Sequence, residues 1–193
     1  MERYFSPCPR GLEEALAAEL GRLGAQRVGR VDGGVGFEGP IELAYVVNLE
    51  SRLASRVLWR VGGGPYRDER ELNALARGVA WPTHFRADRT IRVDVAATRS
   101  PLRSLEFATL TVKDAVCDRF RDEQGKRPSV DKRMPDVRVH AYLTEREATF
   151  YLDTSGEPRF KRGWRRDAEE ARLREILAAG LISISGWEPG TPF

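Results

Sequence analysis

A change of hydrophobic period within residues 103–153 constrains the fold of this chain more than any other feature. Between Leu105 and Phe120 apolar side chains recur every three or four residues, which predicts a helix with one buried stripe. Residues 137–143 and 148–153 instead alternate apolar and polar side chains, which predicts two strands joined by a polar turn. A helix beside a hairpin predicts a mixed α/β (α+β) fold. The helical stripe comprises Leu105, Ala108, Val112, Ala115, Val116 and Phe120.

Residues 1–64 carry the same two kinds of pattern in the order β-α-β-β-α-β. A short strand is expected over residues 3–6, and a helix follows that ends at Gly24. Asp32-Gly33-Gly34, between two short strand-like runs, predicts a hairpin because glycine accepts a positive φ. A helix over residues 41–49 and a strand over residues 56–61 complete a ferredoxin-like unit. The first helix presents Leu12, Leu16, Leu20 and Leu23 on one face.

The run Gly62-Gly63-Gly64-Pro65 is predicted to be a linker. A phosphate-binding loop is the alternative, but G-x-G-x-x-G and Walker spacings are both missing. We therefore expect three domains, at residues 1–64, 65–166 and 167–193. The second contains the helix and hairpin and adds a short basic strand near residues 159–164. The third begins with an amphipathic helix over residues 168–185, with Leu173, Ile176, Leu177, Leu181 and Ile184 on one side.

Positive charge is concentrated in two segments, although the net charge is only +3. RNA binding needs cations that converge on phosphates, with aromatic or guanidinium planes for stacking. The loop at residues 125–133 is interleaved with Asp122, Glu123, Asp131 and Asp136, whereas the second segment has no acid before Asp167. The second segment is therefore predicted to contribute more, and a solvated basic surface is the alternative. The candidates are Arg103, Lys113, Lys126, Arg127, Lys132, Arg133, Arg159, Lys161, Arg162, Trp164, Arg165 and Arg166.

No catalytic or metal-binding constellation is apparent in the sequence. Cys8 and Cys117 lack C-x-x-C spacing, and His84 and His140 lack partners at useful spacings, so ordinary structural roles are favoured. Asp114 and Asp118 lie one helical turn apart, but neighbouring Lys113 and Arg119 favour a solvated helix face. No run is long and apolar enough to cross a membrane. We expect a cytoplasmic monomer without metal.

Six runs of residues resemble the N-terminal part of the bacterial large-subunit ribosomal RNA guanine-N2 methyltransferases. They are RLASR at 52–56, TVKDA at 111–115, GKRPSVD at 125–131, DVRV at 136–139, LDTSG at 152–156 and KRGWR at 161–165. The resemblance covers residues 5–193 and implies a ferredoxin-like domain followed by a THUMP domain, which thiouridine synthases, RNA methyltransferases and pseudouridine synthases share. It further implies large-subunit ribosomal RNA as the partner and S-adenosylmethionine as the methyl donor of the parent protein.

The residues that hold S-adenosylmethionine in this family are not found before Phe193. We therefore expect a fragment that ends in the helix preceding a Rossmann-like methyltransferase domain, with no cofactor of its own and no activity alone. The family usually has tyrosine where Trp164 stands, which keeps an aromatic ring at that position. Two alternatives stay open. One is a THUMP module of a tRNA-modifying methyltransferase or thiouridine synthase, and the other is a protein-interaction domain that does not bind RNA.

Overall fold

The computed structural model describes residues 1–156, 173–187 and 190. The chain divides into two compact units: unit 1 comprises residues 1–59 and 154–193, and unit 2 comprises residues 60–153. The basic strand predicted near residues 159–164, and the first residues of the helix predicted to begin at 168, lie outside the described residues. The predicted domain limits 1–64, 65–166 and 167–193 stay a prediction.

Unit 1 has the predicted βαββαβ order and is ferredoxin-like. Its sheet has the order β2-β3-β1-β4, and β1 pairs antiparallel with both β3 and β4. Gly33, in the turn between β2 and β3, has φ +80°, as the hairpin prediction required. The elements are β1 (Glu2–Pro7), α1 (Glu13–Arg22), β2 (Gln26–Val31), β3 (Gly34–Gly39), α2 (Ile41–Glu50) and the first residues of β4 (Leu58–Pro65).

The core of unit 1 forms between the sheet and its helices. Leu16 and Leu20 of α1 and Val47 of α2 are fully buried. The rings of Tyr4 and Phe37, which are register partners on β1 and β3, stack with centroids 5.2 Å apart. The leucine face predicted for the first helix is thus confirmed at Leu12, Leu16 and Leu20, whereas Leu23 is half-buried.

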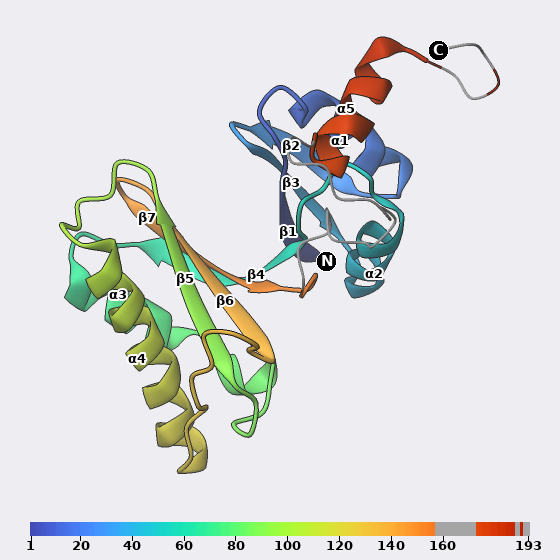
Figure 1. The fold of residues 1–193 in the computed structure, drawn as a ribbon. Coiled ribbons are helices and arrows are strands. Elements are labelled where there is room, and N and C mark those ends of the chain that lie inside the picture. Colours follow the sequence, from blue (N-terminus) through green and yellow to red (C-terminus); the bar gives the residue numbers. More distant parts are fainter. Residues whose placement is uncertain (157–172, 188–189, 191–193) are drawn as a thin grey trace. The chain divides into compact units, whose positions relative to one another are not determined.

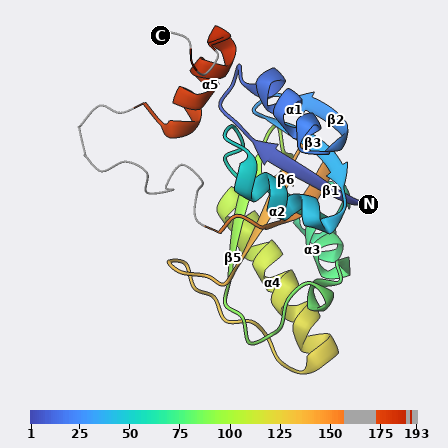
Figure 2. The same cartoon turned by 90° about the vertical axis from the view of Figure 1, so that its right-hand side faces the viewer.

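Helix α5 (Glu175–Ser185) lies beside α1 in unit 1 (Figures 1 and 2). Its buried residues are Ile176 and Gly180. A Cβ atom on Gly180 would lie 2.4 Å from Leu12 Cδ1, so the helix approaches the core along its smallest residue. The face predicted for this helix is therefore partly wrong. The exposed members of the predicted stripe are Leu173, Leu181 and Ile184.

Unit 2 is a four-stranded sheet with two helices packed against each other on one face (Figure 1). The strand order is β4-β7-β6-β5, with β5 and β6 parallel and β6 and β7 antiparallel. The predicted helix and hairpin are confirmed. The elements are the end of β4, α3 (Glu69–Gly78), η1 (Trp81–Thr83), β5 (Ile91–Ala97), α4 (Leu105–Gln124), β6 (Val137–Leu143) and β7 (Glu147–Asp153).

Helix α4 supplies the centre of the unit 2 core. Ser104 caps its N-terminus by accepting a hydrogen bond from the Phe107 N–H at 3.1 Å, and Gly125 ends it in the left-handed conformation. Of the predicted stripe only Leu105 is exposed, because it occupies the first position of the helix. The buried members are Ala108, Val112, Ala115, Val116 and Phe120.

The predicted linker at residues 62–65 is wrong, because strand β4 runs through all four residues. Glycine is required there by close approach of neighbouring elements. A Cβ atom on Gly62 would lie 2.6 Å from Val79 Cγ2, and one on Gly64 would lie 3.0 Å from Leu75 Cδ1 of α3. Gly63 has a φ of +151°, and a Cβ atom on it would lie 2.6 Å from the carbonyl oxygen of Ala148. These positions are filled by protein atoms, so the glycines do not form a phosphate cradle either.

Candidate nucleic-acid interface

The cationic loop, residues 125–136, is fastened to the start of β5. The Ile91 N–H donates to the Ser129 carbonyl at 2.8 Å, and the Asp131 N–H donates to the Ile91 carbonyl at 3.1 Å. Val130 thereby forms an isolated parallel bridge with Ile91. Pro128 is buried, so the two basic ends of the loop are held on either side of a fixed centre.

Two carboxylates shape the second half of the loop through backbone contacts. Asp131 Oδ1 accepts hydrogen bonds from the N–H groups of Arg133 at 2.8 Å and Met134 at 3.1 Å. Asp136 Oδ2 accepts from the Thr90 N–H at 2.8 Å and from the Thr90 hydroxyl at 3.0 Å. These hydrogen bonds favour the charged carboxylates, so the Met134 and Arg133 amides lower the pKa of Asp131 and Thr90 lowers that of Asp136.

The loop cations are not paired with the acids that surround them in sequence. Asp122 accepts from Arg77 Nε at 3.0 Å, Glu123 pairs with Arg119, and Asp136 lies 3.6 Å from Arg89. Asp131 is occupied by backbone amides. The predicted ranking of the two basic segments assumed that these acids neutralise the loop cations. That assumption is wrong, because each acid is paired with another group. Within residues 1–156, 173–187 and 190, no ion pair involves Lys126, Arg127, Lys132 or Arg133, and all four are exposed.

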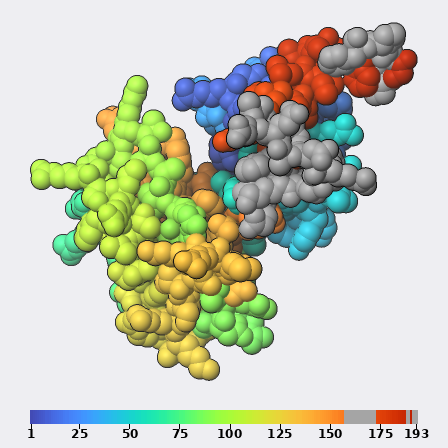
Figure 3. Space-filling model, viewed as in Figure 1, coloured from blue at the N-terminus to red at the C-terminus, as the bar shows by residue number. Residues whose placement is uncertain are grey.

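Two further candidates, one just before α4 and one on it, are placed differently from the loop. Helix α4 has 20 residues, so its ends lie about 30 Å apart. Arg103 precedes the N-terminal end, whereas the cationic loop follows the C-terminal end and lies at the lower end of unit 2 in Figure 3. Lys113 Nζ is 2.6 Å from Asp114 Oδ1. Arg103 and the loop therefore cannot grip the same phosphate, and Lys113 is already engaged. The candidates Arg159, Lys161, Arg162, Trp164, Arg165 and Arg166 lie outside the described residues.

The sheet face that α3 and α4 leave uncovered continues the basic surface. Arg92 on β5 is the register partner of Arg138 on β6, and Arg92 Nη1 donates to the Lys132 carbonyl at 3.1 Å. Beyond this row come His140 and then Tyr142 along β6. The sequence already placed these side chains opposite the core. It did not place Arg92 beside Arg138, because nothing in the local pattern specifies which strands pair.

The described residues offer no catalytic centre. Burial raises the pKa of Cys8 to about 11 and also raises that of Cys117, so neither thiol is a ready nucleophile at neutral pH. Asp114 pairs with Lys113 as predicted, whereas Asp118 pairs with Arg121 because Arg119 pairs with Glu123 instead. Within these residues no cluster of three or more His, Cys, Asp or Glu side chains could hold a metal ion. The described helices include none that is long and apolar enough to span a bilayer.

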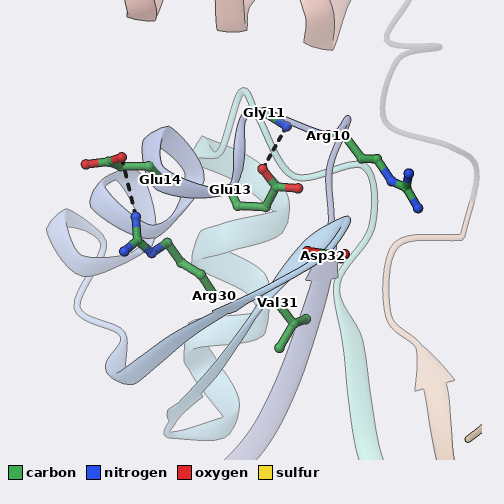
Figure 4. Close-up of a pocket in the computed structure, with 7 residues that line it drawn as sticks. All are labelled: Arg10, Gly11, Glu13, Glu14, Arg30, Val31 and Asp32. Carbon is green, nitrogen blue, oxygen red and sulfur yellow. Dashed lines mark hydrogen bonds and ion pairs between the residues drawn. The ribbon is translucent and has the colours of Figure 1, made fainter.

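A hollow of about 500 Å³ in unit 1 is likewise structural (Figure 4). Glu13 accepts hydrogen bonds from the Gly11 N–H at 2.7 Å and the Gly33 N–H at 3.0 Å, which ties the start of α1 to the β2–β3 turn. Glu14 lies 3.4 Å from Arg30. Both glutamates are thus occupied by contacts within unit 1.

Two family models match the chain in the regions of the two units. Residues 3–58 match the RlmL ferredoxin-like domain, and residues 66–153 match the THUMP domain. Residues 66–153 form a THUMP domain. The cationic loop and the uncovered sheet face both lie within the THUMP domain, so the candidate surface is a property of that domain.

Similar proteins agree with the predicted resemblance. A ribosomal RNA large subunit methyltransferase K/L of Psychromonas ingrahamii is 43% identical over 188 residues, which are 97% of this chain and 25% of that protein. A "predicted N6-adenine-specific DNA methylase" from Listeria monocytogenes has the same fold, with a TM-score of 0.87 and 25% identity over 99% of this chain and 50% of that one. The structure of SMU.472, solved in complex with SAH, also has this fold. Its TM-score is 0.85 and its sequence identity is 27%, over 99% of this chain and 50% of that one. This chain spans about a quarter of the length of the curated relatives it matches.

The carboxylate that shapes the loop leads to a pH prediction. Because folding lowers the pKa of Asp131 below the ordinary 3.8, its stabilising effect is complete above that value and is lost as the pH falls through the folded-state pKa. Asp131→Asn keeps an oxygen for the two amides but removes the charge. We expect this variant to be less stable at pH 7 and to lose less stability between pH 5 and pH 3.

Urea midpoints at both pH values measure this effect. Glu145→Gln is the matched control, because Glu145 is an exposed acid in the β6–β7 turn, and it should keep the pH dependence of the parent chain. An unchanged acid dependence in Asp131→Asn would show that the carboxylate does not hold the loop.

Proposed function

We propose that this chain is the RNA-binding portion of a ribosomal RNA methyltransferase and that it positions structured large-subunit ribosomal RNA for base methylation. The observation that supports the proposal most directly is the cationic loop, whose four cations have no carboxylate partner among the described residues. Cations already paired with carboxylates gain little from phosphates, whereas free ones release counterions when they bind RNA. The THUMP match and the relatives' names favour RNA over an acidic protein as the partner.

The finer chemistry belongs to the parent protein and is proposed by resemblance. The parent would transfer a methyl group from S-adenosylmethionine to the exocyclic amine of a guanine, after the base leaves its stack. The glycine run at residues 62–64 does not fit that cofactor, because Val79, Ala148 and Leu75 fill the space beside it. The proposed division of labour is therefore RNA capture by this portion and methyl transfer elsewhere in the parent. A tRNA-modifying parent is the competing assignment, and a tRNA competitor distinguishes the two.

The proposal predicts a specific salt dependence. Replacing Lys126, Arg127 and Lys132 together with alanine should weaken binding to a ribosomal RNA hairpin at least about tenfold near 0.1 M salt and lower the salt slope by about two to three. Fluorescence anisotropy of the full chain at several salt concentrations measures both quantities. The corresponding triple variant of Lys161, Arg162 and Arg165 tests the later segment, whose predicted priority stays a prediction.

A matched control removes the same charge from paired cations. Arg3, Arg30 and Arg86 each lie within 3.4 Å of a carboxylate, on Glu38, Glu14 and Asp88 respectively. Their triple alanine variant has the same net charge as the loop variant but should bind RNA almost like the parent chain. If both triple variants lost the same RNA affinity, net charge alone would determine binding and the unpaired state of the loop cations would not. If the parent chain does not bind RNA, the proposed function is wrong.

A further inference from the structure

The uncovered face of the unit 2 sheet is a graded surface that runs from cations to aromatic rings. Its side chains are ordered by the strand register: Arg92 beside Arg138, then Asp94 beside His140 and Tyr151, then Ala96 beside Tyr142 and Thr149. Neighbouring strands are about 4.8 Å apart and successive rows about 6.7 Å apart. Every one of these residues is at least partly exposed. The face is therefore a platform of three rows rather than a set of scattered side chains.

The first row brings two like charges together. Arg92 and Arg138 are direct partners across the parallel strands, an arrangement that is unfavourable unless an anion is shared. Asp94 Oδ1 accepts from Arg92 Nε at 2.9 Å and from Nη2 at 2.7 Å, so this carboxylate is committed to Arg92. Arg138 has no carboxylate partner among the described residues. Asp94 therefore already compensates the charge of Arg92, and Arg138 is the cation of this row that is available to a phosphate.

The later rows supply planar side chains. Tyr142 is 41% exposed, and its hydroxyl donates to Thr98 Oγ1 at 2.9 Å, which fixes the direction of the ring. The His140 side chain, in the row before it, is 25% exposed, and its Nε2 atom lies 3.8 Å from Asp153 Oδ2. Aromatic rings on an open sheet bind unstacked bases, which a base-paired helix cannot offer.

We propose that this sheet face binds a single-stranded segment of RNA, with a phosphate at Arg138 and bases against Tyr142 and the exposed part of His140. The inference rests on the proposed function and deepens it, because it names the RNA class and a second contact surface. The cationic loop and the face are continuous through the contact of Arg92 with the Lys132 carbonyl. One RNA can thus pass from a structured part held by the loop to a single strand on the sheet.

Variants of the full chain separate stacking from charge. Tyr142→Val keeps a strand-forming side chain but removes the ring, and it should weaken binding of a pyrimidine octamer about tenfold without changing the salt slope. Tyr142→Phe keeps the ring and loses only the Thr98 contact, so it should bind like the parent. Arg138→Gln should lower the salt slope on the octamer by about 0.7. Circular dichroism confirms that each variant is folded.

Two comparisons make the test specific. The same sequence as a blunt duplex should bind the parent chain and Tyr142→Val equally well, because paired bases cannot reach the ring. Tyr45, on α2 of unit 1, is 75% exposed, and Tyr45→Val should leave octamer binding unchanged. Crosslinking of a 5-iodouridine octamer should map to Tyr142 or His140.

The outcomes distinguish this inference from the proposed function. If the loop variant loses RNA affinity while Tyr142→Val binds the octamer like the parent, the sheet-face inference is wrong and the proposed function stands. Equal losses for octamer and duplex, or for Tyr142→Val and Tyr45→Val, also overturn the inference. If the parent chain binds neither RNA, both proposals are wrong.

Discussion

Val112→Asp is expected to unfold unit 2. Val112 is fully buried at the centre of α4, where the helix faces the sheet. A carboxylate there must either stay charged in an apolar environment or take up a proton, and both cost free energy in addition to the lost packing. The expected loss is about 4 kcal/mol or more, against a total stability of about 5–15 kcal/mol for a domain. Urea unfolding followed by far-ultraviolet circular dichroism, with hydrogen exchange of the β5 and β6 amides, measures the effect.

Leu110→Asp is the matched control for this variant. Leu110 lies two residues earlier on the same helix and is 47% exposed, so the new carboxylate stays in water. The difference between aspartate and leucine in helix propensity is then the main cost, at about 0.5 kcal/mol. Similar midpoints for Val112→Asp and Leu110→Asp would show that the assigned buried face of α4 is incorrect.

Gly63→Ala is expected to break the pairing of β4 within unit 2. The added Cβ atom would lie 2.6 Å from the Ala148 carbonyl oxygen and 3.1 Å from Thr149 Cα, and both are backbone atoms that no side-chain rotation can move. The φ of +151° adds strain, because L-residues rarely adopt it. We expect a loss of about 3 kcal/mol or more, measured as a lower urea midpoint and faster exchange of the β7 amides.

Gly78→Ala makes the same substitution where there is space. Gly78 is the last residue of α3, and a Cβ atom placed on it meets no atom within 4 Å. Alanine is the better helix former, so this variant should be as stable as the parent or more stable by up to about 1 kcal/mol. If Gly63→Ala is tolerated as well as Gly78→Ala, strand β4 does not approach β7 as closely as the structure places it.

The residues that follow a simple period were assigned correctly from the sequence. Val112 and Phe120 recur at helical spacing, and Val139 and Ala141 alternate with Arg138 and His140, so local pattern alone identified their buried faces. The hydrophobic effect acts on each side chain according to its own polarity, which is why such patterns can be read locally. Leu181 and Ile184 were misassigned because α5 meets the core at Gly180, and glycine carries no hydrophobic signal.

The sequence by itself determined that this chain forms two α/β units, with a basic loop between a long helix and a hairpin. Tertiary structure decided how that loop is charged and what lies beside it. Arg77 and Arg89 come from elsewhere in unit 2 to pair with Asp122 and Asp136. An ion pair depends on distance in space, and the parallel pairing that sets Arg92 beside Arg138 joins residues 46 positions apart. Neither contact leaves a trace in local periodicity, because the free energy that selects it arises only when separate elements pack.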